Sequence, residues 1–198
     1  MIRTGDVLEN PVTGEVLRFL QTAADTNGDA VVVEVTVRPD GFVAAPHVHP
    51  FQTERFEILE GTLTFRRGRE EVVAVAGDTV VLEPGTPHRF WNSGTRDARF
   101  VTTVSPALAF ESLIETMFSL AADGQTNGKG MPNPLRLAVI ANAHFDVVRL
   151  PLVPQSLQKL ALAFGAPLGR LAGYGPTYAS AAATTTTYTT GRAALAGA

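Results

Sequence analysis

Cysteine is absent from this sequence of 198 residues. Disulfide bonds and thiolate metal sites are therefore excluded, and any metal ion must be bound by nitrogen and oxygen ligands. An excess of positive charge is also missing, because 16 lysine and arginine residues stand against 19 aspartate and glutamate residues, for a formal net charge of −3. Binding to a phosphate backbone requires a basic face, so we expect no nucleic-acid partner.

Long apolar segments are missing as well. No uncharged apolar run approaches the roughly 20 residues that a membrane-spanning helix needs. The first residues, MIRTGDVLENP, lack the apolar core of a signal peptide. We therefore expect no membrane association and a cytoplasmic location. No internal repeat of roughly 20 to 50 residues is visible, which predicts one barrel and not a duplicated pair.

Short predicted strands fill residues 1–105. Segments rich in β-branched and aromatic residues, several of them alternating with a period of two, are separated by turns of glycine, proline, asparagine and aspartate. The predicted strands include EVLRFL, VVVEVTV, the stretch ending in His-Val-His, RFEILE, TLTFRR, EVVAVA, DTVVLE, PHRFWN and ARFVTTV. Many short strands at even spacing predict a mainly β fold, an antiparallel sandwich or a small barrel.

The pattern becomes helical after the predicted barrel. Three helices are expected to begin at Ser105-Pro106, Asn133-Pro134 and Pro154. We expect residues 106–178 to form a helical extension that packs on the barrel or mediates formation of a homodimer. Residues 179–198 are of low complexity and are predicted to be a disordered tail.

Histidine is scarce, with four residues in the chain, yet two of them lie one residue apart. Residues two apart on a strand project from the same face, so His47 and His49 are expected to point together into the barrel. Residues 50–53 can reverse the chain and bring Glu54 back toward this pair. His88 follows a turn and enters a further strand. The fourth histidine, in a predicted helix, has no partner in the sequence and is interpreted as structural.

Several ionisable groups inside one barrel need an explanation. Buried charges without partners are costly, and a glutamate among aromatic residues would be forced toward its neutral form. A divalent cation resolves this cost by accepting three imidazole nitrogens and one carboxylate oxygen. Such ligands suit manganese, iron, cobalt, nickel, copper or zinc. We therefore predict one divalent transition metal bound by His47, His49, Glu54 and His88.

An apolar substrate pocket is expected around this site. Phe56 and Ile58 share the parity of Glu54 along one strand, and Phe90 shares that of His88. The predicted pocket residues are Phe51, Phe56, Ile58, Phe90 and Trp91. No further inward acid or histidine is expected within the barrel, so Glu54 is the candidate catalytic base if it is not a ligand.

Two stretches of the sequence resemble the paired signatures of the cupin superfamily. The first motif, Gly-x5-His-x-His followed by glutamate and glycine, is matched by Gly41, His47, His49, Glu54 and Gly61. The second motif is matched by Gly77, Gly85, His88 and Asn92. Its proline position holds Glu83, with Pro84 beside it, which alters a turn and not a ligand.

The resemblance implies a single double-stranded β-helix barrel, jelly-roll-like and often dimeric, with a metal ion held by the four residues named above. The helical part is similar to that of single-domain bacterial cupins. Cupins carry out many reactions, so the family does not fix the activity. We expect a metal-dependent enzyme for a small, largely apolar organic substrate, and a dioxygenase-type reaction is favoured because no separate general base is visible. The alternatives are a Lewis-acid isomerase, cyclase or lyase, and a non-catalytic protein that binds a metal or a small molecule.

Overall fold

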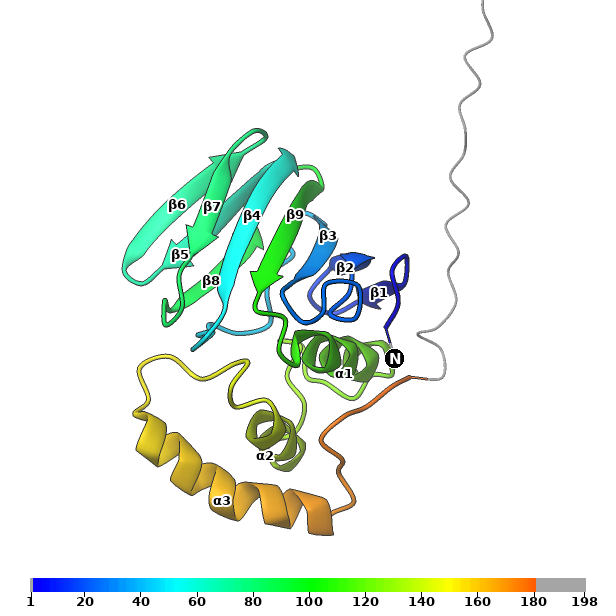
Figure 1. Cartoon of the computed structure of the whole chain (residues 1–198), viewed down its shortest axis with the longest axis vertical. Helices are drawn as coiled ribbons and strands as arrows, with labels where there is room; N and C mark the ends of the chain where they lie inside the picture. The colour runs from blue at the N-terminus through cyan, green and yellow to red at the C-terminus, as the bar shows by residue number, and fades with distance from the viewer. Residues whose placement is uncertain (1, 181–198) are drawn as a thin grey trace, which may run out of the picture.

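A computed structural model describes residues 2–180 and shows a β-barrel of two sheets with helices packed below one end (Figure 1). The described part of the chain has nine strands: β1 (Val7–Asn10), β2 (Glu15–Gln21), β3 (Val31–Val37), β4 (Thr53–Glu60), β5 (Thr62–Arg67), β6 (Glu70–Val75), β7 (Thr79–Leu82), β8 (His88–Asn92) and β9 (Ala98–Ser105). The larger sheet has the order β1-β2-β3-β9-β4-β7, and the smaller has the order β6-β5-β8. All named pairs are antiparallel.

Alternation of apolar residues along the strands directs one face of each sheet into the barrel. In β3 every second residue from Val31 to Val37 is buried, and in β4 Glu54, Phe56 and Ile58 are buried while Arg55 is exposed. Phe56 lies at the centre of an aromatic core and contacts Phe65, Phe90 and Phe100 at ring-centroid distances of 5.0, 5.9 and 5.6 Å. The predicted mainly β fold with C-terminal helices is confirmed.

The predicted strand that ends in His-Val-His is a series of isolated bridges and not a regular strand. Phe42 pairs with Trp91, and His47 pairs with His88 through two backbone hydrogen bonds of 2.9 Å. Pro46 and Pro50 interrupt the ladder because proline has no backbone N–H to donate.

Three helices follow the barrel: α1 (Phe110–Ala122), α2 (Pro134–Ala143) and α3 (Gln155–Leu171). The second and third begin where the sequence predicts, and the Asn133 side chain accepts a hydrogen bond from the backbone N–H of Arg136. The predicted helix start at Ser105-Pro106 is wrong. β9 continues to Ser105, whose hydroxyl donates to the carbonyl of Asp29, and the N–H of Ala107 donates to Gly28.

The helices lie in two layers against the open end of the barrel. α1 lies directly beneath β1, β2 and β3, and α2 and α3 form a pair further out (Figure 1). Gly169 allows close approach within this pair, because a Cβ there would lie 2.4 Å from the carbonyl oxygen of Leu135. The outer face of α3 exposes apolar side chains at helical spacing, namely Leu157, Leu160, Phe164, Leu168 and Leu171.

Two further observations concern the ends of the sequence and the membrane. No helix within residues 2–180 is long and apolar enough to cross a bilayer. Most of the predicted low-complexity tail, residues 181–198, lies outside the described residues.

Candidate metal centre

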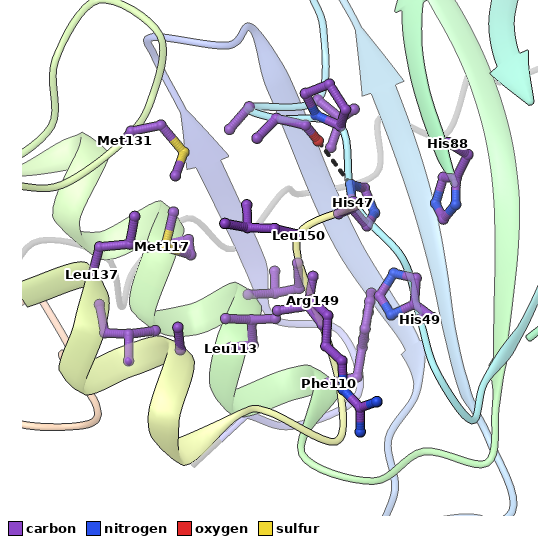
Figure 2. Close-up of a pocket in the computed structure, with 18 of the residues that line it drawn as sticks. His47, His49, His88, Phe110, Leu113, Met117, Met131, Leu137, Arg149 and Leu150 are labelled. Carbon is purple, nitrogen blue, oxygen red and sulfur yellow. Dashed lines mark hydrogen bonds between the residues drawn. The ribbon is translucent and has the colours of Figure 1, made fainter. Parts of the chain in front are cut away.

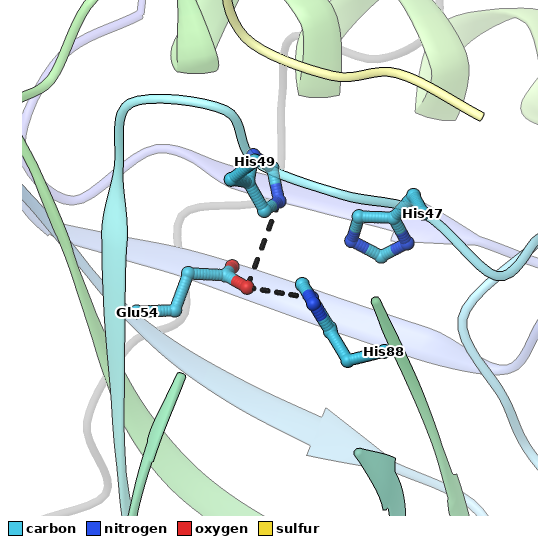
Figure 3. Close-up of side chains that lie close together, drawn as sticks. All are labelled: His47, His49, Glu54 and His88. Carbon is cyan, nitrogen blue, oxygen red and sulfur yellow. Dashed lines mark ion pairs between the residues drawn. The ribbon is translucent and has the colours of Figure 1, made fainter. Parts of the chain in front are cut away.

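The four predicted ligands converge on one point inside the barrel (Figure 3). One candidate ligand atom from each of His47, His49, Glu54 and His88 lies within 4.8 Å of the other three. The Oε2 atom of Glu54 lies 2.8 Å from Nε2 of His88 and 3.6 Å from Nε2 of His49. The ring centroid of His47 lies 4.3 Å from that of His88 and 4.9 Å from that of His49.

Backbone pairing brings these residues together. The His47–His88 bridge places two imidazoles side by side, and the N–H of Gly85 donates to the carbonyl of His49 at 2.8 Å. Glu54 is the second residue of β4, where it faces Leu82 of β7 and Val104 of β9. Three separate segments of chain therefore hold the site.

The second nitrogen of each imidazole is used by a backbone carbonyl. The Nδ1 atoms of His47, His49 and His88 lie 2.8, 2.6 and 2.9 Å from the carbonyl oxygens of Ala45, Val147 and Thr86, respectively. A carbonyl oxygen can only accept, so each Nδ1 carries the hydrogen and each Nε2 is left with a lone pair. This is the arrangement by which histidine ligands of metals are oriented in proteins.

Gln52 gives His49 a second contact. Its side chain is buried, and its amide nitrogen donates to the carbonyls of Pro106 and Ala107 at 2.9 and 3.1 Å. These two bonds turn the amide oxygen toward Nδ1 of His49, at 3.2 Å. No sequence pattern singles out this glutamine, because a polar residue in a turn is usually exposed.

Charges in the cluster favour an ionised carboxylate. Burial acts to raise the pKa of Glu54, but the neighbouring His49, His88 and His47 outweigh it and lower that pKa to about 2. Burial acts to lower the pKa of His88, but the Glu54 carboxylate outweighs it and raises that pKa above its ordinary value. Burial, together with His88 and His49, lowers the pKa of His47 to about 3.

The geometry of these atoms fits a shared cation. Glu54 Oε2 and His88 Nε2 are buried, lie 2.8 Å apart and have no hydrogen-bond partner within residues 2–180. With the hydrogen of His88 on Nδ1, neither of the two atoms carries a hydrogen to donate. Ligand atoms that bind one ion at about 2.1 Å lie about 3 Å apart in adjacent octahedral positions. The cluster of three histidines and one glutamate is therefore compatible with one divalent transition metal.

An apolar cavity of about 470 Å³ opens beside the cluster (Figure 2). Its barrel wall includes Val33, Val35, Phe56, Phe90 and Phe100. Its opposite wall comes from the helical part of the chain, with Phe110, Leu113, Met117, Met131, Leu137 and Leu150. In Figure 2 the three histidines lie on the barrel side, and the methionine and leucine side chains face them from the helices and the connecting loops.

Three of the five predicted pocket residues do not line this cavity. Phe56 and Phe90 do line it. Ile58 is buried in the core two positions further along β4 than Phe56. Trp91 follows Phe90 and so points to the other face of β8, where the Arg89 guanidinium lies 5.1 Å from its ring centroid. Phe51 is 54% exposed in the turn before β4.

The expectation that the barrel holds no other inward acid is wrong. Glu15, at the start of β2, is buried and lines the same cavity. Its Oε2 atom accepts a hydrogen bond of 2.7 Å from the hydroxyl of Thr13. Burial raises the pKa of Glu15 to about 7, and the Thr13 hydrogen bond opposes this only in part. The alternation of residues along β2 could have indicated that Glu15 points inward, because Glu15 lies on the same face as the buried residues Leu17 and Phe19.

Strand register separates Glu15 from the metal ligands. Glu15 pairs with Val37 of β3, which pairs with Ala98 of β9, whereas Glu54 pairs with Val104 of β9. The six positions from Ala98 to Val104 correspond to roughly 20 Å along the strand. The backbones of Glu15 and Glu54 therefore lie near opposite ends of the larger sheet.

The fourth histidine, His144, belongs to the packing of the helices. It is buried, with Nδ1 at 2.9 Å from the carbonyl of Ile140 and Nε2 at 3.2 Å from the hydroxyl of Ser112. These contacts join the end of α2 to α1 and fit the structural role that the sequence suggests.

The barrel matches a known family of protein domains. A family model described as a cupin domain matches residues 33–104, from β3 to β9. Residues 33–104 therefore form a cupin domain. Both signature motifs fall within the matched residues, so the four candidate ligands of this cupin occupy the family's motif positions.

Solved structures similar to this cupin include three bacterial proteins. A protein of Klebsiella pneumoniae with a double-stranded β-helix domain is 24% identical, with 55% of this chain and 84% of that chain covered and a TM-score of 0.42. A predicted oxalate decarboxylase of Thermotoga maritima is 20% identical, with 54% and 98% covered and a TM-score of 0.47. The polyketide cyclase RemF of Streptomyces resistomycificus is 21% identical, with 53% and 78% covered and a TM-score of 0.44. No curated protein matches the chain significantly.

Proposed function

We propose that this cupin is a metal-dependent enzyme that acts on a small, largely apolar organic substrate, with a dioxygenase-type oxidation as its reaction. The observation that supports the proposal is the set of three histidines, each with Nδ1 bonded to a backbone carbonyl, and one ionised glutamate beside an apolar cavity. When bound, a divalent transition metal would supply Lewis acidity and, for a redox-active ion, electron transfer.

The charge of the site favours an anionic oxygen in the substrate. Three neutral imidazoles and one carboxylate leave a net positive charge around a divalent ion. An enolate or a catecholate would offset that charge inside a cavity whose walls are apolar. The aromatic rings of Phe56, Phe90 and Phe100 would pack against the carbon skeleton and exclude water from it.

Proton transfer separates the dioxygenase proposal from its main alternative. Near the four candidate ligands, the described lining residues include no other carboxylate or imidazole, and Glu15 lies near the other end of the sheet. An enol or a catechol is acidic enough to release its own proton, which suits an oxidation without a separate base. A Lewis-acid isomerase, cyclase or lyase needs a general base, and Glu15 supports this alternative for a substrate that reaches it.

We also propose that the partner of this chain is a second copy of itself, bound through α3. The side chains Leu157, Leu160, Phe164, Leu168 and Leu171 form an exposed stripe, and Leu150 and Leu152 lie exposed in the preceding loop. The exposed parts of these seven side chains together amount to roughly 800 Å², if a fully exposed side chain has an area on the order of 150–200 Å². A standard protein interface buries about that area on each partner.

Elemental analysis of protein purified without added metal, combined with measurement of oxygen uptake, tests the function. Iron, manganese, nickel, cobalt or copper, together with oxygen uptake on addition of catechols or enols, would support the dioxygenase. Rearrangement or cleavage of such compounds without oxygen uptake would support the Lewis-acid alternative. Bound zinc without turnover of either kind would leave a protein that binds a metal or a small molecule.

A matched pair of variants ties the activity to the cluster. Glu54→Gln removes the carboxylate ligand, whereas Glu57→Gln changes a carboxylate on the other face of the same strand. Metal content and turnover should fall in the first variant and not in the second. Equal metal content in the two variants would refute the assignment of Glu54 as a ligand.

A further inference from the structure

Apart from Thr102, Arg149 and Gln158, the polar side chains of the cavity lie in two separate places. One is the cluster of candidate metal ligands, and the other is the beginning of β2, where Asn10 and Glu15 line the cavity. The wall between them is formed by apolar residues of the larger sheet, among them Leu17, Val35 and Phe100. Between these two ends, the sheet side of the cavity offers a ligand the buried hydroxyl of Thr102, which has no hydrogen-bond partner within residues 2–180.

Glu15 is the polar group at the second end that remains available to a ligand. The side-chain oxygen of Asn10 already accepts hydrogen bonds of 3.1 Å from the backbone N–H groups of Val12 and Thr13. Glu15 is 5% exposed, and within residues 2–180 its side chain has one hydrogen bond, from Thr13, and no ion pair with a cation. One hydrogen bond satisfies only part of the capacity of a carboxyl group.

Packing alone does not explain a glutamate at this position. Leu17 and Phe19 continue the same inward face of β2, and an apolar residue at position 15 would extend it without the cost of burying a carboxyl group. Burial raises the pKa of Glu15 to about 7, so much of the group is neutral near that pH. A neutral carboxyl group both donates and accepts a hydrogen bond.

We propose that Glu15 determines substrate specificity by hydrogen bonding to an uncharged oxygen, a hydroxyl or a carbonyl, at the end of the substrate that lies away from the metal. This inference rests on the proposed function in taking the same cavity as the substrate site. It names the substrate class as an apolar molecule with oxygen at both ends. Two or three fused rings suit the cavity of about 470 Å³ better than a single ring does.

An uncharged oxygen fits this environment better than an ammonium group. A cation would have to leave water for an apolar cavity, and its desolvation is costly even beside an opposite charge. The Thr13 hydroxyl already donates to Glu15, so the second oxygen of a neutral carboxyl group is free to serve as donor toward the substrate.

Three small probes of similar shape test the proposal on the full-length protein as purified: 2-naphthol, 2-methylnaphthalene and 2-(aminomethyl)naphthalene. Calorimetry or probe fluorescence measures their affinities for the unchanged protein and for Glu15→Leu. We expect 2-naphthol to bind about tenfold more tightly than 2-methylnaphthalene. Glu15→Leu should abolish this preference, whereas Glu15→Gln should retain part of it because an amide can still donate.

Several outcomes would overturn the proposal: equal affinities for 2-naphthol and 2-methylnaphthalene, a naphthol preference that persists in Glu15→Leu, tighter binding of the charged amine, or no binding of any probe. Circular dichroism checks that the leucine variant folds, and Glu15→Met, which keeps an unbranched side chain, replaces it if it does not. Metal content and oxygen uptake are measured separately. A naphthol preference in a protein without metal would retain the role of Glu15 and reject the proposed enzyme. Bound metal and oxygen uptake without a naphthol preference would support the proposed enzyme and reject the role of Glu15.

Discussion

Glu15 should make this protein less stable as the pH rises. Burial raises its pKa in the folded protein from the ordinary 4.5 to about 7. Below 4.5 the group is protonated in both the folded and the unfolded chain, and its contribution to stability is fully present. As the pH rises from 4.5 to about 7, the unfolded chain releases a proton that the folded chain retains, so the free energy of unfolding falls.

The size of this effect follows from the two pKa values. The gap between 4.5 and about 7 is two to three pH units, and each unit corresponds to about 1.4 kcal/mol. The expected loss is therefore about 3 kcal/mol by the time the pH exceeds the folded pKa. Because a domain is typically stable by only about 5–15 kcal/mol, the loss is large enough to measure.

Glu15→Gln tests this reasoning because glutamine keeps the shape of the side chain and does not titrate. Urea unfolding is measured for the unchanged protein, Glu15→Gln and Glu9→Gln between pH ~4.5 and ~8. Glu9→Gln is the matched control, since Glu9 is exposed on the neighbouring strand. The difference in free energy of unfolding between Glu15→Gln and the unchanged protein should shift in favour of the variant by about 3 kcal/mol from the lowest to the highest pH of this range. If the two curves stay parallel, the carboxyl group is not held in a desolvated site and the reasoning fails.

Four other predictions concern the metal ligands, the hydrogen bond from Thr13 to Glu15 and the dimer. His49→Ala should lose most of its bound metal while circular dichroism shows a folded barrel; unchanged metal content would discard His49 as a ligand. Metal occupancy should fall on acidification through the imidazole range near pH ~6.5, since the raised pKa of His88 lets a proton compete for its nitrogen; occupancy that stays flat into strong acid would contradict the site. Thr13→Val removes the hydrogen bond that lowers the pKa of Glu15, so infrared titration of the carboxyl group should find a still higher value, and an unmoved value would mean that the bond does not form. Phe164→Lys places a charge in the exposed stripe of α3 and should turn a dimer into a monomer in light scattering; a monomer before substitution would reject the proposed dimer.

The candidate ligands could be predicted from the sequence because local rules place them. Strand parity puts Glu54 and Phe56 on the same face, and a turn brings Glu54 back to His47 and His49. The same rule applied to Trp91 would have excluded it from the pocket, since it follows Phe90 on one strand. Glu15 obeys the rule as well, but no motif drew attention to it.

The other half of the site depends on contacts between distant parts of the chain. The carbonyl of Val147 accepts from Nδ1 of His49 across 98 positions of sequence, and the Phe110 ring lies 6.3 Å from that of His49. Apolar spacing in α1 predicts a buried face but not which part of the barrel covers it. The helical wall of the cavity therefore required the structure.

Because barrel and helices each supply one wall of the cavity, any compound that fills it links the two parts of the chain. Such a compound should raise the melting temperature even if the protein does nothing to it chemically, and at a hundredfold excess over its Kd the gain is about 2.7 kcal/mol. A library of oxygen-bearing aromatic compounds can thus be ranked by thermal shift before any reaction is known. Compounds that contact only the barrel rim, and leave α1 and the loop at Leu150 untouched, should stabilise it less.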